Sequence, residues 1–262
     1  MLPCLLHLRY DNQKEVFIWL CEGRYPYEDL KESIPYNDLK DGIPGDDKIN
    51  QGSSRNFMRM GLCQEKVKMM NMEAYPDREK AEQILTEAEQ CNPGPWVLHS
   101  RNVAKCAEQI AARTGMNADK AYVLGLLHDV GRRAGIGQLK HVYYGWKYMN
   151  ELGYEAVAKV CLTHSYNTQR FEDDMGKCDI DPEQESELRT ALNACVYDDY
   201  DRLIQLCDSI AMAEGVVDIV VRMSDIKRRY GSYPQAKWDK NLELKRLFEE
   251  KAGVDSIYEI VK

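Results

Sequence analysis

A set of histidine and aspartate side chains between residues 99 and 208 has the chemistry of a metal site. The stretch LLHDVGRR, residues 126–133, ends an apolar run with His128 and Asp129 side by side. The full set comprises His99, His128, Asp129, His141, His164 and Asp208. Neutral imidazole and carboxylate are preferred donors for divalent transition metals. Such residues favour chemistry in which a bound ion acidifies water or offsets developing negative charge.

These polar side chains share helical faces with apolar residues. In PWVLHSRNVAKCAEQIAA, His99 lies on the same stripe as Val103, and similar spacing places His128, His164 and Asp208 on apolar faces. A lone inward histidine is usually a hydrogen-bonded core residue, and a lone inward aspartate is usually a cap or half of a salt bridge. Burying several such groups without partners would cost several kcal/mol each. We therefore expect them to satisfy one another or an enclosed ion.

The elements that must position these residues are helices. Helical periodicity begins near residue 72, with Asn117 as an N-cap and Gly115 and Gly153 as C-terminal stops. We expect helices near 78–91, 95–114, 117–131, 139–152, 154–165, 183–196, 198–213, 215–230, 235–251 and 254–261. Strand signals are almost absent from this part of the chain. The main domain is therefore predicted to be an all-α helical bundle with extra C-terminal helices.

The first 71 residues have a different pattern. They lack sustained periodicity and contain many turn-forming segments. We predict an N-terminal extension over 1–71, irregular or weakly ordered, followed by a helical domain over 72–262. A small accessory module is the alternative for 1–71. We expect a chain that begins at Met72 to fold without the extension.

Composition limits the classes of partner. The 262-residue chain carries a net charge of −8, which argues against broad binding to nucleic acid or anionic membranes. No apolar run approaches the ~20 residues of a membrane span, and the N-terminus is too short and too weakly basic for a secretory signal. The nine cysteines include no CxxC pair, and we interpret them as reduced core residues. We expect a soluble, cytoplasmic protein without a nucleic-acid polymer or membrane partner.

The order of the candidate ligands resembles the HD-domain superfamily of metal-dependent phosphohydrolases. The chain has no HExxH motif, so the zincin pattern does not apply. The superfamily signature is a histidine, an adjacent His-Asp doublet and a distant aspartate, each on a different helix. The segments LHSRNVAKCA, GLLHDVGRR and LIQLCDSIAMAEG carry the resemblance, which covers about 99–225.

The resemblance implies a ligand set. It assigns a first metal to His99, His128, Asp129 and Asp208. In members with two metals, two further histidines lie between the doublet and the last aspartate, and the doublet aspartate bridges the ions. His141 and His164 occupy that interval. We therefore expect one or two divalent ions, and the donor types suit Fe, Mn, Co, Ni or Zn.

Two residues beside the doublet have expected roles. Arg132 stands where many members of the superfamily carry a cation, and we expect it to act with Asp129 in catalysis by binding substrate phosphate. The alternative for Arg132 is a solvated cation favoured by the helix dipole, and this alternative is preferred for Arg101, Arg133 and Lys140. Gly131 is expected to let the chain leave the helix.

The predicted function is hydrolysis of a soluble phosphoester, such as a nucleotide or a related small molecule, by a metal-bound hydroxide. Two ions with two carboxylates would leave roughly +2 of charge to meet a phosphate dianion. Three alternatives stay open: a phosphodiesterase for signalling nucleotides, a non-catalytic nucleotide-binding regulator, and a di-iron oxygenase. The complete donor set counts against the regulator. Substrate, metal, nuclearity and oligomeric state are left open by the sequence.

Overall fold

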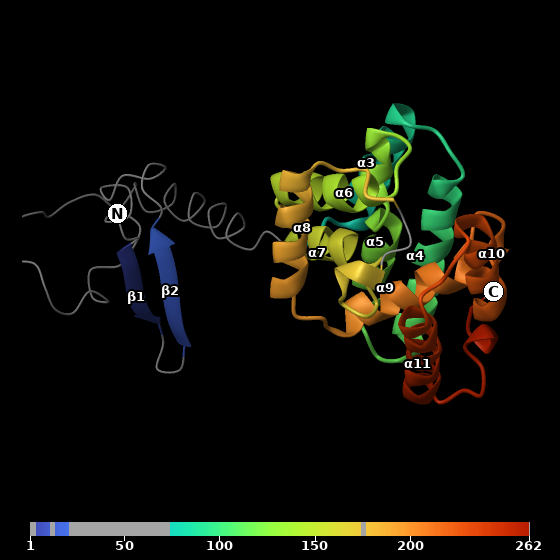
Figure 1. Cartoon of the computed structure of the whole chain (residues 1–262). Coiled ribbons are helices and arrows are strands. Elements are labelled where there is room, and N and C mark those ends of the chain that lie inside the picture. The colour runs from blue at the N-terminus through green and yellow to red at the C-terminus, as the bar shows by residue number, and fades with distance from the viewer. Residues whose placement is uncertain (1–3, 11–13, 21–73, 174–176, 262) are drawn as a thin grey trace, which may run out of the picture. The chain divides into compact units, whose positions relative to one another are not determined.

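The computed structural model describes residues 4–10, 14–20, 74–173 and 177–261, and the chain divides into two units, Met1–Asn71 and Met72–Lys262 (Figure 1). In the first unit, β1 (Cys4–Tyr10) pairs antiparallel with β2 (Lys14–Leu20), and Cys4 lies opposite Leu20. No regular element was predicted there, although β-branched and aromatic residues, which favour strands, follow one another in EVFIWL. The irregularity expected for the rest of 1–71 lies outside the described residues.

The second unit is helical, which confirms the predicted all-α class. Its α-helices are α3 (Arg78–Cys91), α4 (Trp96–Arg113), α5 (Ala118–Leu127), α6 (Leu139–Glu151), α7 (Glu155–Thr163), α8 (Pro182–Ala194), α9 (Asp199–Ile210), α10 (Ile219–Tyr230) and α11 (Gln235–Ala252). Short 3-10 helices are η3 (Val130–Ala134), η4 (Phe171–Asp173) and η5 (Ile257–Glu259). A two-stranded hairpin, β3 (Ala211–Met212) and β4 (Gly215–Val216), follows α9.

Several predicted helix ends are confirmed. The Asn117 side chain accepts a hydrogen bond from the Lys120 amide at 2.9 Å, as expected of an N-cap. Gly115 and Gly153, which follow α4 and α6, adopt φ values of 74° and 78°, a left-handed conformation that ends a helix and favours glycine.

Three predicted helices were too long. The helix predicted over 117–131 ends at Leu127, and the chain continues as η3. The helix predicted over 198–213 ends at Ile210 because the following residues pair in the β3–β4 hairpin, which also delays the start of α10. The segment 254–261 contains only η5.

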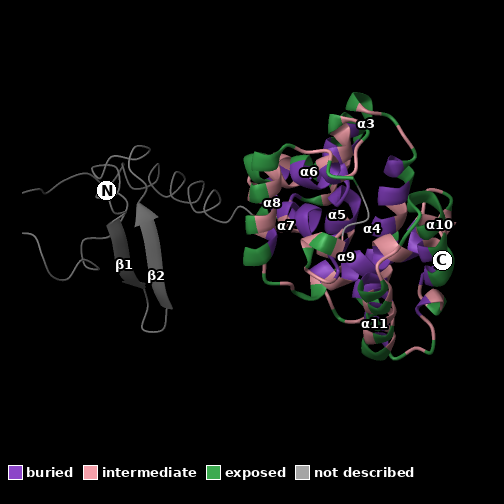
Figure 2. Cartoon of the chain, viewed as in Figure 1, coloured by how far each residue is buried: buried purple, intermediate pink, exposed green. Residues whose placement is uncertain are grey.

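The core of the helical unit lies between α4, α5, α7 and α9, where buried residues are concentrated (Figure 2). Helix α5 approaches α4 closely at Gly125, where a Cβ atom would lie 2.9 Å from the Ala104 Cα. Only glycine permits this separation without a shift of backbone. The close crossing fixes the end of α5, which carries His128, against the helix that carries His99.

Two further glycines mark close contacts between elements: Gly131 lies where η3 contacts α6, and Gly145 lies where α6 contacts α7. A Cβ atom on Gly131 would lie 1.9 Å from the His141 carbonyl oxygen, and one on Gly145 would lie 3.3 Å from the Cys161 Sγ. Gly131 is not among the described glycines with positive φ, so its predicted role in letting the chain turn was wrong. Its physical role is to leave room for the backbone of α6.

The described cysteines are free thiols, and Cys106, Cys161 and Cys207 are buried, in agreement with their interpretation as reduced core residues. Cys91 and Cys178 are exposed, so the interpretation as core residues was wrong for these two. Within the described ranges, no helix combines the length and the apolar character needed to cross a bilayer.

Candidate metal centre

The six predicted ligands meet in two groups of three. The first triad is His99, His128 and Asp208, and the second triad is Asp129, His141 and His164. Within each triad, one ligand atom from every residue lies within 4.8 Å of the others. The first triad draws on α4, the end of α5 and α9. The second draws on the turn after α5, on α6 and on the end of α7.

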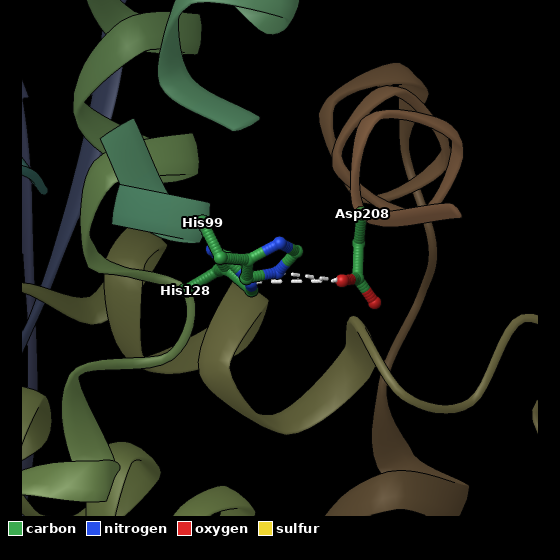
Figure 3. A group of neighbouring side chains, drawn as sticks. All are labelled: His99, His128 and Asp208. Carbon is green, nitrogen blue, oxygen red and sulfur yellow. Dashed lines mark ion pairs between the residues drawn. The ribbon is translucent and has the colours of Figure 1, made fainter. Parts of the chain in front are cut away.

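In the first triad, one carboxylate oxygen faces two imidazoles. The His99 Nε2 lies 3.0 Å and the His128 Nε2 lies 3.9 Å from the Asp208 Oδ1. Figure 3 shows both rings directed at the carboxylate, which approaches from α9. The ring centroids of His99 and His128 are 5.3 Å apart.

The second triad repeats this arrangement around Asp129. The Asp129 Oδ1 lies 3.4 Å from the His141 Nε2 and 3.6 Å from the His164 Nε2. The two Nε2 atoms are 3.2 Å apart. One carboxylate oxygen again faces two imidazole nitrogens.

Asp129 also connects the two triads. Its Oδ2 accepts a hydrogen bond from the Arg132 Nε at 2.6 Å and lies 3.9 Å from the His128 Nε2. Asp129 therefore directs one oxygen towards each triad, as a bridging carboxylate must. The imidazole nitrogens nearest to Asp129 are those of His141 and His164, and the bridging role expected of Asp129 in a two-metal site stays a prediction.

Two of the histidines are oriented by the ends of their own helices. The His128 Nδ1 lies 2.7 Å from the Gly125 carbonyl, and the His164 Nδ1 lies 2.9 Å from the Cys161 carbonyl. Each histidine directly follows its helix, where the last carbonyls lack an intrahelical partner. A carbonyl can only accept, so Nδ1 carries the proton and Nε2 presents its lone pair to the triad.

Burial controls the charge of the imidazoles. Desolvation lowers the pKa of His128 to about 4. Burial, with the neighbouring Arg132 guanidinium, holds the pKa of His141 well below its usual value. Both rings are therefore neutral near pH 7, which is the form that binds metal.

The carboxylates are held in their charged form. Burial alone would raise the pKa of Asp129, but Arg132 and His141 hold it well below its usual value. Burial also opposes ionisation of Asp208, yet the hydrogen bond from His99 and the nearby imidazoles lower its pKa. Both carboxylates are thus available as anionic ligands.

Each triad contains two buried polar atoms that have no hydrogen-bond partner among the described residues: the His99 Nδ1 and the His128 Nε2 in the first triad, and the Asp129 Oδ1 and the His141 Nδ1 in the second. Two of these atoms, the His128 Nε2 and the Asp129 Oδ1, face the other donors of their triads. An unsatisfied buried group costs about 1–3 kcal/mol. A divalent cation would coordinate both atoms, and the nitrogen and oxygen donors of each triad suit such an ion. The residues present therefore fit a metal in either triad.

A cavity of about 480 Å³ opens onto both triads. Its wall includes His99, Asp129, His141, His164 and Asp208. Arg132 also lines this cavity. By contrast, Arg133 lies over the ring of Tyr148, and Arg101 pairs with Glu82 at 2.6 Å. Neither of these two arginines lines the cavity, but both have partners within the protein, unlike the solvated cations that the preferred alternative described.

Part of the cavity wall was missed by sequence analysis. It consists of Arg222, Asp225, Ile226, Arg229 and Tyr230 from α10, Tyr233 from the following turn, and Lys237 and Asn241 from α11. In VVRMSDIKRRYG, the spacing of these α10 residues marks one helical face. That pattern alone does not show which face is turned towards the histidines.

Comparison with known proteins agrees with the order of the ligands. Residues 97–213 match the family model described as HD domain. Ribonuclease Y of Mesoplasma florum is 27% identical over 145 residues, which are 53% of this chain and 24% of that relative. The chain therefore spans about a quarter of the relative's length. None of the solved structures matches the chain. All six predicted ligands fall within the matched residues, so residues 97–213 form an HD domain that contains both triads.

Proposed function

We propose that the protein is a phosphohydrolase that cleaves a small soluble phosphoester, such as a nucleotide or a related molecule, with divalent metal bound in the two triads. The observation that carries this proposal is the position of Asp129, which directs one oxygen towards each triad. When bound, the ions would act as Lewis acids and lower the pKa of water so that a nucleophile forms at neutral pH.

The residues around the triads prepare this chemistry. His128 and His164 keep Nε2 unprotonated because Nδ1 donates to a backbone carbonyl. Arg132 holds the Asp129 Oδ2 through its Nε, and its side chain also lines the cavity. The remaining guanidinium N–H groups can bind a phosphate oxygen. Arg132 is thus proposed to orient Asp129 and to bind substrate.

Charge favours an anionic substrate. Two divalent ions and the carboxylates of Asp129 and Asp208 would leave roughly +2 at the site, which would stabilise a phosphate dianion and its transition state. The cavity wall adds the cations of α10 and α11. This balance favours phosphoester hydrolysis over oxygenase chemistry on an uncharged substrate.

The size of the cavity favours a small molecule. Its volume of about 480 Å³ lies within the ~300–1,000 Å³ of typical small-molecule sites. Ribonuclease Y is by its name an enzyme that acts on RNA, so RNA is the polymer against which the proposal must be tested. The net charge of −8 weighs against tight binding of a polyanion.

The test is a substrate screen on metal-depleted protein reloaded with Mn, Fe, Co, Ni or Zn. Nucleoside phosphates, generic phosphoesters, cyclic dinucleotides and a short RNA are compared, with metal content measured in parallel. We expect turnover of a small phosphoester that is lost in Asp129→Asn and kept in Asp119→Asn, an exposed carboxylate on α5 that pairs with Arg78. Absence of bound metal and of turnover under every metal would refute the proposal. Cleavage of RNA alone would reassign the substrate.

A further inference from the structure

The wall formed by α10 and α11 has a charge pattern that the triads do not explain. Five residues of α10 line the cavity at positions 222, 225, 226, 229 and 230, so one face of this helix is turned towards it. The adjoining residues Tyr233 and Lys237 continue the wall. Three of these side chains are cations: Arg222, Arg229 and Lys237.

One of the three cations is neutralised locally. The Arg229 Nε lies 2.9 Å from the Asp225 Oδ2, and Arg228 binds the other oxygen of that carboxylate at 2.7 Å. Asp225 therefore forms ion pairs with two arginines on its own helix. Its charge is not available to Arg222, one turn away towards the N-terminus.

Arg222 lacks such compensation. Within the described ranges of the chain, no carboxylate lies at ion-pair distance from Arg222, and its Nε is buried without a hydrogen-bond partner. Lys237 is only 7% exposed, and its Nζ donates a hydrogen bond to the Ser165 carbonyl at 2.6 Å. A guanidinium that is partly removed from water is costly unless an anion accompanies it. The open side of Arg222 is the cavity.

This wall is joined to the first triad by a polar network. The Tyr233 hydroxyl accepts a hydrogen bond from the Asn241 Nδ2 at 2.7 Å, and the Asn241 Oδ1 accepts one from Ser209 at 3.1 Å. Ser209 directly follows Asp208. Arg222, Tyr233, His99 and Asp208 also line the same cavity, so one small ligand can contact Arg222 and the first triad together.

We propose that Arg222 and Lys237 form an anion-binding subsite, so that the substrate carries two phosphoryl groups, one at the triads and one at the wall of α10 and α11. This inference rests on the proposed function, which it makes more specific. A guanidinium matches a phosphoryl group because it donates two parallel hydrogen bonds. The second group can be joined directly to the first, as in a nucleoside diphosphate, or sit elsewhere on the ligand, as in a nucleoside bisphosphate.

The experiment compares Arg222→Ala and Arg222→Lys with Arg228→Ala. Arg228 is a matched control because it lies on the same helix, is 79% exposed and does not line the cavity. The probes are adenosine 5′-monophosphate, adenosine 5′-diphosphate and adenosine 3′,5′-bisphosphate, with Mn²⁺-loaded protein. Steady-state kinetics give KM and kcat for each, and circular dichroism with a thermal melt shows that each variant is folded.

We expect Arg222→Ala to raise KM about tenfold or more for one of the two probes with two phosphoryl groups, as loss of a hydrogen bond to a charged group predicts. The monophosphate should change less than about twofold, since its single phosphoryl group occupies the triads. Arg222→Lys should retain part of the effect, and Arg228→Ala should match the wild type. The probe that responds identifies whether the phosphoryl groups are joined or separated. Equal losses for all three probes, or none, would overturn the subsite.

A binding measurement separates this inference from the proposed function. Calorimetric titration of the same three nucleotides is independent of turnover. If neither these probes nor the screened phosphoesters are hydrolysed under any metal, but Arg222→Ala weakens binding of a two-phosphoryl probe selectively, hydrolase activity is refuted and the subsite stands. If hydrolysis proceeds while Arg222→Ala binds every probe like the wild type, the subsite is refuted and the hydrolase stands.

Discussion

The two triads have the same donors but are built differently. The first joins residues far apart in the chain, His99 and Asp208, through the packing of α4 against α9. The second is assembled within the consecutive elements η3, α6 and α7 around Gly131. Both triads line the cavity, and Asp208, with a side chain that is 28% exposed, is the most exposed ligand of the six. A site that depends on the global fold thus adjoins one that is assembled locally.

A substitution at Asp129 should affect both triads together, because its two oxygens face different triads. We expect Asp129→Ala to lose both ions and to lower kcat by about a thousandfold or more, since activation of water depends on the metals. Elemental analysis and turnover of the substrate found in the screen provide the measurement. A variant that keeps full metal content and rate would contradict the role assigned to Asp129.

Single replacements within the triads should separate them. His164→Ala should lower metal content from about two to about one per chain and reduce turnover by about a hundredfold, with little change in melting temperature, because one ion would no longer be held. His99→Ala should also leave one ion, held by the second triad. Metal stoichiometry and thermal melts of both variants test this. Unchanged stoichiometry and rate in His164→Ala would leave a one-metal site.

The local assembly of the second triad can be disturbed without touching a ligand. Gly131→Ala would place a methyl group 1.9 Å from the His141 carbonyl oxygen, so α6 must shift. We expect a loss of about 3 kcal/mol in the free energy of unfolding, as for severe overpacking, together with loss of the ion of the second triad. Urea unfolding and metal analysis measure the two effects.

Gly135→Ala is the control for that variant. Gly135 has a φ of 112°, but a Cβ atom there would meet no other atom within 4 Å, so alanine adds backbone strain without a collision. It should cost about 1–3 kcal/mol and leave two ions in place. If both variants retain two ions, the close contact at Gly131 does not position His141.

The smallest effect expected concerns the metal-free protein. His128 has a pKa of about 4 when folded, compared with about 6.5 for an ordinary imidazole. Between these values the unfolded chain binds the extra proton, so stability falls as pH is lowered. From pH 7 to pH 5 the free energy of unfolding should decrease by about 2 kcal/mol through this group. Urea titrations at the two pH values check the prediction, and a flat profile would show that His128 is not buried as a neutral ring.

Much of this site could be predicted from the sequence because four of the six candidate ligands lie on apolar helical faces that local spacing reveals. His99, His128, His164 and Asp208 share faces with apolar residues, and this periodicity does not depend on the rest of the fold. The division into triads could not be predicted in the same way. It depends on how closely α5, η3 and α6 cross, which Gly125 and Gly131 determine through contacts with distant backbone.

The wall of α10 and α11 was missed for a related reason. Arg222 and Lys237 carry no pattern that distinguishes them from other surface cations in a chain with 35 lysines and arginines. Their place in the cavity follows from the turn between the two helices and from the hydrogen bonds of Asn241. Similarly, the end of α9 depended on the β3–β4 hairpin, which involves only two residues per strand.

The hydrogen bonds from His128 and His164 to main-chain carbonyls limit how the site can be modified. In many metalloproteins, a carboxylate behind the histidine sets ligand basicity, and exchanging that carboxylate tunes affinity. Here the acceptors are the carbonyls of Gly125 and Cys161, which no side-chain substitution can remove. Evolution or engineering could adjust the basicity of these two imidazoles only by bending the helices that carry them. The metal preference of the site should therefore change slowly during evolution, even where substitutions in the cavity wall alter the substrate that is bound.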